Sequence, residues 1–282
     1  MARIKIAPEY IDDYLETERP QPLCDNFLES LSRDVMSGKM DPSTIEDTYE
    51  KFKTECQQWI FNSHLNQLAG FESFLSPDII IGCTQFIDSI YMTQVPQVLE
   101  GDYRYHQRLG NWETRLLRKN IPLIIALPFP NRGSIHPDMN SILDQCIDYK
   151  IPVHIDGAWI TCCRDINFDF SHPAIRSVGI SLSKGLGLGW NRVGLRWTKK
   201  HTNDSIKIMN DFNMNNRALV MIGLHYIRNV QSDYLWKTHG DRYYKVCDDF
   251  NLEPTNSIYL AMRNGSPVGV SPLIRYLENA EL

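Results

Sequence analysis

Short apolar runs that end in glycine or polar residues recur through the middle of the chain. Five of them have the length and composition of buried strands: 78–82 (DIIIG), 122–128 (PLIIALP), 152–156 (PVHID), 177–183 (SVGISLS) and 193–197 (VGLRW). Stretches of helical character separate several of these runs, at 84–95, 103–118 and 137–149. This alternation predicts an α/β fold whose mainly parallel central sheet carries helices on both faces.

The two ends of the chain have a different pattern. The first 75 residues are mainly helical in character, and a capping box at Ser43 and Glu46 predicts a helix that runs to about Leu65. Near the other end, 256–278 predicts two short strands about Gly265, followed by a helix or tail. We expect a large α/β domain over 70–230, and an N-terminal helical segment with a reduced α+β small domain from 1–69 and 231–282.

Charge and composition exclude several kinds of partner. The 282 residues carry 29 Lys+Arg against 34 Asp+Glu, a formal net charge of −5, so neither nucleic acid nor an anionic membrane is an expected partner. The start of the chain lacks the apolar stretch of a signal peptide. Seven cysteines, an odd number without regular spacing, fit reduced thiols in the cytoplasm. Cys162 and Cys163 have no second pair at zinc-like spacing, so we expect no metal site.

Polar residues follow the ends of the predicted strands. Cys83 and Thr84 come after the first strand at a predicted helix start, where free backbone N–H groups can hold a phosphate. Asp156 ends the third strand, and Lys184 follows the fourth, eight residues before Arg192. Ligands of open α/β sheets collect at the carboxyl ends of the strands. These residues are therefore the candidate site.

The glycine-rich run after Lys184, GLGLG, raises a dinucleotide-binding alternative. That fingerprint joins the first strand of the fold to a helix and is followed by an acidic residue. Here the run lies deep in the chain, follows a lysine and leads through Arg192 into another strand. This context disfavours nicotinamide binding.

Four motifs in order resemble the fold-type I pyridoxal-phosphate enzymes, most closely the aspartate aminotransferase superfamily, over about 64–200. The family pattern of Asn-Pro-x-Gly, Asp-x-Ala-Tyr, Ser-x-Ser-Lys and Arg-x-Gly is matched by Asn131-Arg132-Gly133, Asp156-Gly157-Ala158-Trp159, Ser181-Leu182-Ser183-Lys184 and Arg192-Val193-Gly194. The resemblance implies pyridoxal 5'-phosphate as the cofactor and Lys184 as its covalent anchor through a Schiff base. Lys184 would also move the proton during catalysis.

The resemblance also assigns the other candidate residues. Asp156 would pair with the pyridinium nitrogen of the cofactor. Arg192, Ser181, Ser183 and Thr84, with the backbone around Cys83, would hold the phosphate. The cofactor ring would be contacted by Asn131 at the phenolic oxygen, by Ala158 beneath it and by Tyr103 on the opposite face. A core tyrosine on a helix is the alternative interpretation of Tyr103.

Departures from the family pattern leave some roles open. Trp159 stands where many relatives have tyrosine, and an indole N–H can donate a hydrogen bond but cannot accept one. His64 occupies the segment from which a tyrosine reaches the partner subunit in the family, although a lone histidine is more often structural. For the substrate carboxylate, Arg275 is the first candidate and Arg263 the second. The chain is also short for the family.

The function that the resemblance implies is amino-group transfer between an amino acid or small amine, the donor, and a keto acid or aldehyde, the acceptor. A lyase or decarboxylase is the alternative within the cofactor class: His154-Ile155-Asp156 is similar to the decarboxylase His-x-Asp, although Ser183 rather than histidine precedes Lys184. A binding or regulatory module without turnover is a third possibility. A homodimer with sites at its interface is expected.

Overall fold

The structure is a computed structural model that describes residues 23, 25–37, 47–109, 113–114, 116–189 and 191–280. Its α-helices are α2 (Asn26–Met36), α3 (Thr48–Phe61), α4 (Gly82–Tyr91), α5 (Arg104–Leu109), α6 (Met139–Asp148), α7 (Leu182–Gly185), α8 (Ser205–Asp211), α9 (Arg217–Asn229), α10 (Tyr234–Asp249) and α11 (Ser271–Ala280). Its strands are β1 (Gln67–Ala69), β2 (Asp78–Ile80), β3 (Gln97–Leu99), β4 (Glu113–Thr114), β5 (Leu123–Ala126), β6 (Val153–Gly157), β7 (Asn167–Asp169), β8 (Ile175–Ser181), β9 (Gly194–Thr198), β10 (Glu253–Pro254), β11 (Leu260–Arg263) and β12 (Ser266–Gly269). Short 3₁₀ helices are η3 (Phe71–Ser73) and η4 (Ile160–Cys162).

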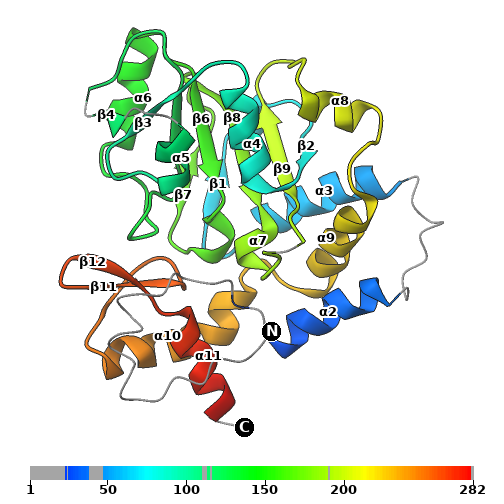
Figure 1. The fold of residues 1–282 in the computed structure, drawn as a ribbon, viewed down its shortest axis with the longest axis vertical. Coiled ribbons are helices and arrows are strands. Elements are labelled where there is room, and N and C mark those ends of the chain that lie inside the picture. The colour runs from blue at the N-terminus through cyan, green and yellow to red at the C-terminus, as the bar shows by residue number, and fades with distance from the viewer. Residues whose placement is uncertain are drawn as a thin grey trace.

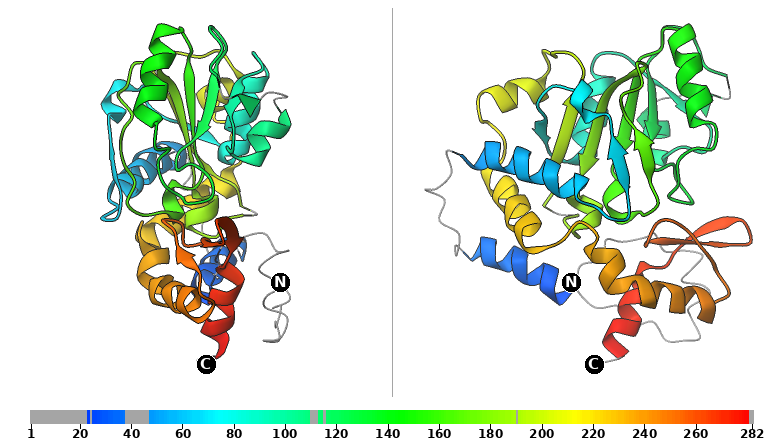
Figure 2. Two further views of the ribbon diagram at one scale, coloured as in Figure 1. Left: turned by 90° about the vertical axis from the view of Figure 1, so that its left-hand side faces the viewer. Right: turned by 180° about the vertical axis from the view of Figure 1, so that it is seen from behind.

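A seven-stranded sheet forms the centre of the molecule, in the order β2-β9-β8-β6-β5-β3-β4. The pairs from β8 to β4 are parallel, whereas β9 is antiparallel to both β8 and β2. Helices α4 and α5 cover one face and α3 and α6 the other (Figures 1 and 2). The predicted α/β class, with its mainly parallel sheet between helices, is confirmed.

The central strands are buried on both faces, which explains their continuous apolar runs. Ile125 of β5 pairs with Ile155 of β6, which pairs with Val178 of β8, and all three are 0% exposed. The five predicted strands match β2, β5, β6, β8 and β9 to within about two residues at each end.

The carboxyl ends of the parallel strands meet at one edge of the sheet. Strand β8 runs directly into α7 there, and the segment that leads into β9 returns beside it (Figure 1). Asp156 on β6 pairs with Gly179 on β8, two residues before Ser181. The candidate residues at the ends of these two neighbouring strands therefore lie close together. The register of the sheet thus brings together residues far apart in the sequence.

A second group of elements lies beyond that edge. The antiparallel sheet β10-β11-β12, with α10 and α11, occupies the lower part of Figure 1. The predicted pair of strands about Gly265 and the helix after them are confirmed, and Gly265 takes the positive φ of +79° that the turn requires. The division into 70–230 and the two flanking segments stays a prediction.

Three predictions of secondary structure need correction. The helix predicted over 103–118 ends at Leu109, because Glu113–Thr114 forms β4 and pairs with β3 at the edge of the sheet. The mainly helical first 75 residues contain β1, which pairs with β7. Helix α3 ends at Phe61 rather than near Leu65, where the chain turns to give β1, and the capping residues Ser43 and Glu46 lie outside the described residues. Across the described ranges we find no helix with the length and hydropathy needed to cross a bilayer.

Candidate active site

Asp156 lies at the carboxyl end of β6 and is 3% exposed. Its Oδ1 accepts a hydrogen bond from the Ala158 amide at 3.0 Å, and its Oδ2 lies 2.9 Å from His106 Nε2. A buried carboxylate needs such partners because its desolvation is costly. These contacts fix the orientation of the carboxylate at the edge of the sheet.

His106 connects Asp156 to a second buried carboxylate that the sequence interpretation missed. His106 on α5 is fully buried, and its Nδ1 lies 3.4 Å from Asp102 Oδ1. Burial lowers the pKa of His106, but its ion pairs with Asp102 and Asp156 outweigh this and raise the pKa to about 9. Asp102 is held in turn by the amides of Tyr103 and Ala126. The chain thus builds an Asp–His–Asp row with a histidine that is cationic at neutral pH.

Lys184 is carried by the short helix α7 immediately after β8. Ser181 caps this helix by accepting a hydrogen bond from the Ser183 amide at 3.1 Å. The ammonium of Lys184 lies 5.2 Å from the centroid of the Trp159 ring. Burial lowers the pKa of Lys184, and the positive charge of Arg192 lowers it further. An amine with a lowered pKa is suited to covalent attack on an aldehyde.

A cluster of anion-binding groups surrounds the start of α4. Arg192 Nη2 donates to Thr84 Oγ1 at 2.7 Å, and Ser181 Oγ donates to Ser183 Oγ at 2.8 Å. Gly82 begins α4 with a φ of +68°, and a Cβ there would lie 2.9 Å from Arg192 Nη2. A glycine is therefore required for the arginine to approach the helix start.

Cys83 is held against the neighbouring strand. It is 3% exposed, and its Sγ donates to the Gly179 carbonyl at 3.4 Å. Burial raises the pKa of Cys83 well above its usual range, and the charge of Asp156 raises it further, so it remains a thiol. Its side chain points into the sheet, so only its backbone is left for the predicted role of holding the cofactor phosphate.

The two aromatic candidates border the same region. Tyr103 is 38% exposed and stands edge-on to His106, with 5.6 Å between the ring centroids. That exposure disfavours the alternative of a core tyrosine. Trp159 packs edge-on against Tyr259, with centroids 5.9 Å apart.

Tyr259 was also missed by the sequence interpretation. It is 1% exposed, its hydroxyl donates to the Lys184 carbonyl, and the hydroxyl oxygen accepts from the Leu23 amide at 3.3 Å. Burial raises its pKa, and the charge of Arg275 opposes this rise. The charge of Arg275, half-buried on α11, therefore acts on the Tyr259 hydroxyl.

Other predicted residues are not brought into this group. Asn131 is exposed with a φ of +77°, and its turn is tied to the C-terminal segment through the Asn256 amide and the Arg132 carbonyl. His64 is exposed, and its amide donates to Asp233 Oδ2 at 2.8 Å. Arg263 is half-buried on β11. The roles of these three residues stay predictions.

Comparison with solved structures shows which known folds this chain resembles. Similar structures include an aminotransferase from Staphylococcus aureus (TM-score 0.57, 12% identity, 93% of this chain and 89% of that one) and an alanine aminotransferase from Pyrococcus furiosus (0.60, 10%, 90% and 78%). A PLP-bound C-S lyase from Staphylococcus hominis is also similar (0.59, 11%, 92% and 81%). The chain has the fold of the fold-type I pyridoxal-phosphate enzymes. No family model and no curated protein matches the sequence.

The described residues fit the cofactor of that fold. A buried carboxylate, a lysine with a lowered pKa and an arginine–hydroxyl cluster at a helix start lie at one sheet edge. These groups match, respectively, the pyridine nitrogen, the aldehyde and the phosphate of pyridoxal phosphate. The fold-type I topology and this donor set therefore agree with each other.

Proposed function

We propose that the protein is a pyridoxal-phosphate-dependent aminotransferase, which moves an amino group between an amino acid or small amine and a keto acid or aldehyde. The observation that carries the proposal is the meeting of Asp156, Lys184 and the Arg192–Thr84 pair at the carboxyl edge of the fold-type I sheet. When bound, pyridoxal phosphate withdraws electrons from the α-carbon of the substrate.

Each residue then has a defined task. Lys184 would hold the cofactor through its amine, and its Nζ would carry the proton that moves during the transfer. Asp156 would keep the ring nitrogen protonated by accepting its hydrogen bond, and His106 holds the carboxylate in place. Arg192 and Thr84 would bind the phosphate.

The substrate carboxylate is assigned to Arg275. Its charge acts on Tyr259, whose hydroxyl is bonded to the Lys184 carbonyl, and this supports the assignment. An arginine fork matches a carboxylate in two parallel hydrogen bonds. Arg275→Lys should therefore raise the KM for an amino acid more than it lowers kcat, whereas the same change at Arg263 should have little effect.

We also propose a homodimer in the cytoplasm. The cysteines that the structure describes are buried free thiols, which suits a reducing compartment. His64 is exposed, as a residue that completes a partner subunit's site must be. Mixing Lys184→Ala subunits with His64→Ala subunits should restore activity, since a hybrid dimer then has one intact site. An absence of recovery in proven hybrids would assign His64 to its own subunit or to no site.

A lyase is the second candidate, because the C-S lyase from Staphylococcus hominis has the same fold. The two reactions differ in what happens to the cofactor. A transaminase given only an amino donor converts its cofactor to pyridoxamine phosphate, whereas a lyase releases ammonia and leaves the cofactor bound to lysine. A protein that does neither with any donor would be a binding module.

The deciding experiment begins with the covalent link. Borohydride reduction of the cofactor-loaded protein followed by peptide mass analysis should place the label on Lys184, and a label on another lysine would refute the assignment. Amino donors are then screened singly by the absorbance change of the bound cofactor, with ammonia measured in parallel. Lys184→Ala provides the control for donor chemistry that does not use this lysine.

A further inference from the structure

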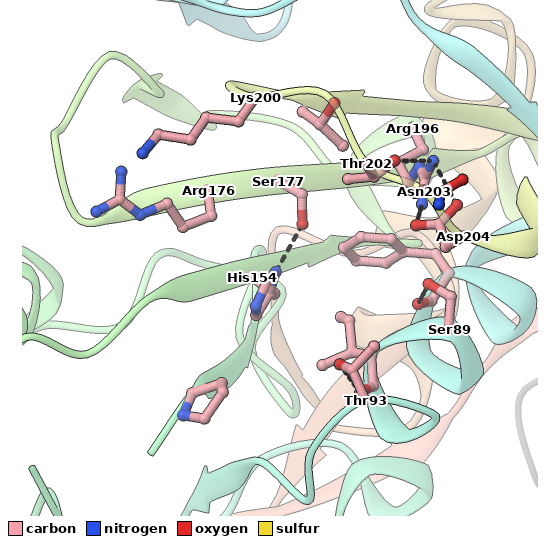
Figure 3. A pocket seen from close by; sticks show the side chains of 14 residues that line it. Ser89, Thr93, His154, Arg176, Ser177, Arg196, Lys200, Thr202, Asn203 and Asp204 are labelled. Carbon is pink, nitrogen blue, oxygen red and sulfur yellow. Dashed lines mark hydrogen bonds and ion pairs between the residues drawn. The ribbon is translucent and has the colours of Figure 1, made fainter. Parts of the chain in front are cut away.

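A cavity lies on the α4 side of the sheet, near the amino ends of β6 and β8, whose carboxyl ends carry the candidate active site. Its volume is about 420 Å³, within the range of small-molecule sites. Strand residues His154, Ser177 and Thr198 line it. Ser89 on α4 and Thr93, just beyond the end of that helix, border it (Figure 3).

Helix α4 spans both places, and its packing keeps them separate. The first turn of α4, with Gly82 and Thr84, belongs to the candidate active site. One turn later Phe86 lies against Gly179 so closely that a Cβ on this glycine would be 2.6 Å from the ring. The cavity begins beyond this contact, so it is not an extension of the active site.

The mouth of the cavity is positively charged. Arg176 and Lys200 are exposed, and their charged ends lie toward each other (Figure 3). In the described part of the chain neither takes part in an ion pair, whereas Arg196 deeper in is neutralised by Asp78 at 2.7 Å and Asp204 at 2.5 Å. Two adjacent unpaired cations repel each other, and an anion between them would remove that repulsion.

His154 on the cavity wall responds to this charge. Burial and the charges of Arg176 and Arg196 together lower the pKa of His154 to about 4. The positive charge at the rim therefore acts on the interior of the cavity, in a chain whose formal net charge is −5.

The floor supplies neutral hydrogen-bonding groups beside apolar surface. His154 Nδ1 lies 2.7 Å from Ser177 Oγ, and the ring is neutral at pH 7 given its lowered pKa. Phe86, Ile90 and Pro122 provide apolar walls. Such a cavity suits a ligand with a flat or branched apolar part and one anionic group.

We propose that this cavity binds a small organic anion, a carboxylate or a phosphate monoester, with its apolar part against Phe86 and Ile90 and its charge between Arg176 and Lys200. The anion supplies the negative charge that Arg176 and Lys200 lack. The site is independent of the proposed transamination.

The test is fluorine NMR titration of the pyridoxal-phosphate-loaded protein with 4-fluorobenzoate, 4-fluorophenyl phosphate and the neutral isostere 4-fluorobenzamide. At least one anion should bind about tenfold more tightly than the amide, since two exposed ion pairs are each worth a few-fold in affinity. The tighter of the two anions identifies the ligand class. Equal affinity for the amide, or no binding of either anion at millimolar concentration, would overturn the proposal.

Variants locate the bound probe. The double variant Arg176→Gln/Lys200→Gln, at two exposed positions, should lose about tenfold in anion affinity. Thr93→Trp should block the mouth, and its matched control Met92→Trp, one exposed residue earlier on the same turn, should not. Arg192→Gln should leave this binding unchanged. Retained binding in Thr93→Trp, or loss in Arg192→Gln, would place the probe elsewhere and refute the site.

Discussion

Replacing His106 with glutamine should change how the stability of the protein depends on pH. His106 is fully buried between two carboxylates, with Nε2 at 2.9 Å from Asp156 and Nδ1 at 3.4 Å from Asp102. Its pKa rises from 6.5 to about 9, because these bonds outweigh the cost of burial. A rise of that size corresponds to about 3 kcal/mol of stabilisation.

The sign follows from the direction of the shift. Because the pKa of His106 is higher in the folded than in the unfolded protein, its stabilisation is fully present below pH 6.5 and is lost as pH rises through about 9. The free energy of unfolding of the wild type should fall by about 3 kcal/mol over this window on account of this residue. The His106→Gln variant has no titrating group there and should lack that part of the slope.

Denaturant unfolding followed by tryptophan fluorescence at several pH values measures the slope. His172→Gln is the matched control, since His172 pairs at 3.2 Å with an aspartate whose side chain is 78% exposed, and it should keep the wild-type slope. If His106→Gln fails to fold, Asp102→Asn should lower the pKa of His106, read directly by NMR of labelled histidine. Equal slopes in wild type and His106→Gln, or an unchanged pKa in Asp102→Asn, would refute the Asp–His–Asp interpretation.

Three further outcomes test the candidate site. Asp156→Ala should lower kcat by about 10²–10³-fold in the transamination assay, because the ring nitrogen loses its acceptor, and near-normal turnover would contradict the role. Gly82→Ala should weaken pyridoxal phosphate binding in a spectroscopic titration, since the added Cβ meets Arg192. Gly265→Ala is the control: it introduces a similar backbone strain at a positive φ, but its Cβ would have no atom within 4 Å, so this variant should bind pyridoxal phosphate normally. Tyr259→Phe should cost about 1–3 kcal/mol in the free energy of unfolding, because it leaves buried backbone groups unpaired, and a cost near zero in denaturant melts would show that water replaces the hydroxyl.

The central strands were predictable because burial on both faces leaves a continuous apolar run in the sequence. The positions of Asp156 and Lys184 were predictable for the same reason, since Asp156 lies at the end of one such run and Lys184 directly follows another. Short strands carry no comparable pattern. Strand β4 has only two residues and is fixed by its pairing with β3, so the helical character of 103–118 misled the prediction.

The residues that hold Asp156 and Lys184 in place required the structure. Asp102 and His106 are four positions apart on a chain segment that follows β3, a spacing that could have suggested one helical face. Nothing in the sequence indicates that this face would meet the end of β6, 50 residues later. Tyr259 is 75 residues from Lys184 and had no pattern that could connect them.

The hydrogen bond between Tyr259 and Lys184 joins the segment before β11 to the candidate active site. The Tyr259 hydroxyl is bonded to the Lys184 carbonyl and to the Leu23 amide, so three distant parts of the chain converge on one buried oxygen. Moving the segment that carries Tyr259 away from the sheet would break these bonds and leave the Lys184 carbonyl and the Leu23 amide unpaired. Under the proposed assignment of Arg275 to the substrate carboxylate, substrate selection should depend on a preformed arginine rather than on domain closure, because the Tyr259 bond ties the segment before β11 to the lysine turn.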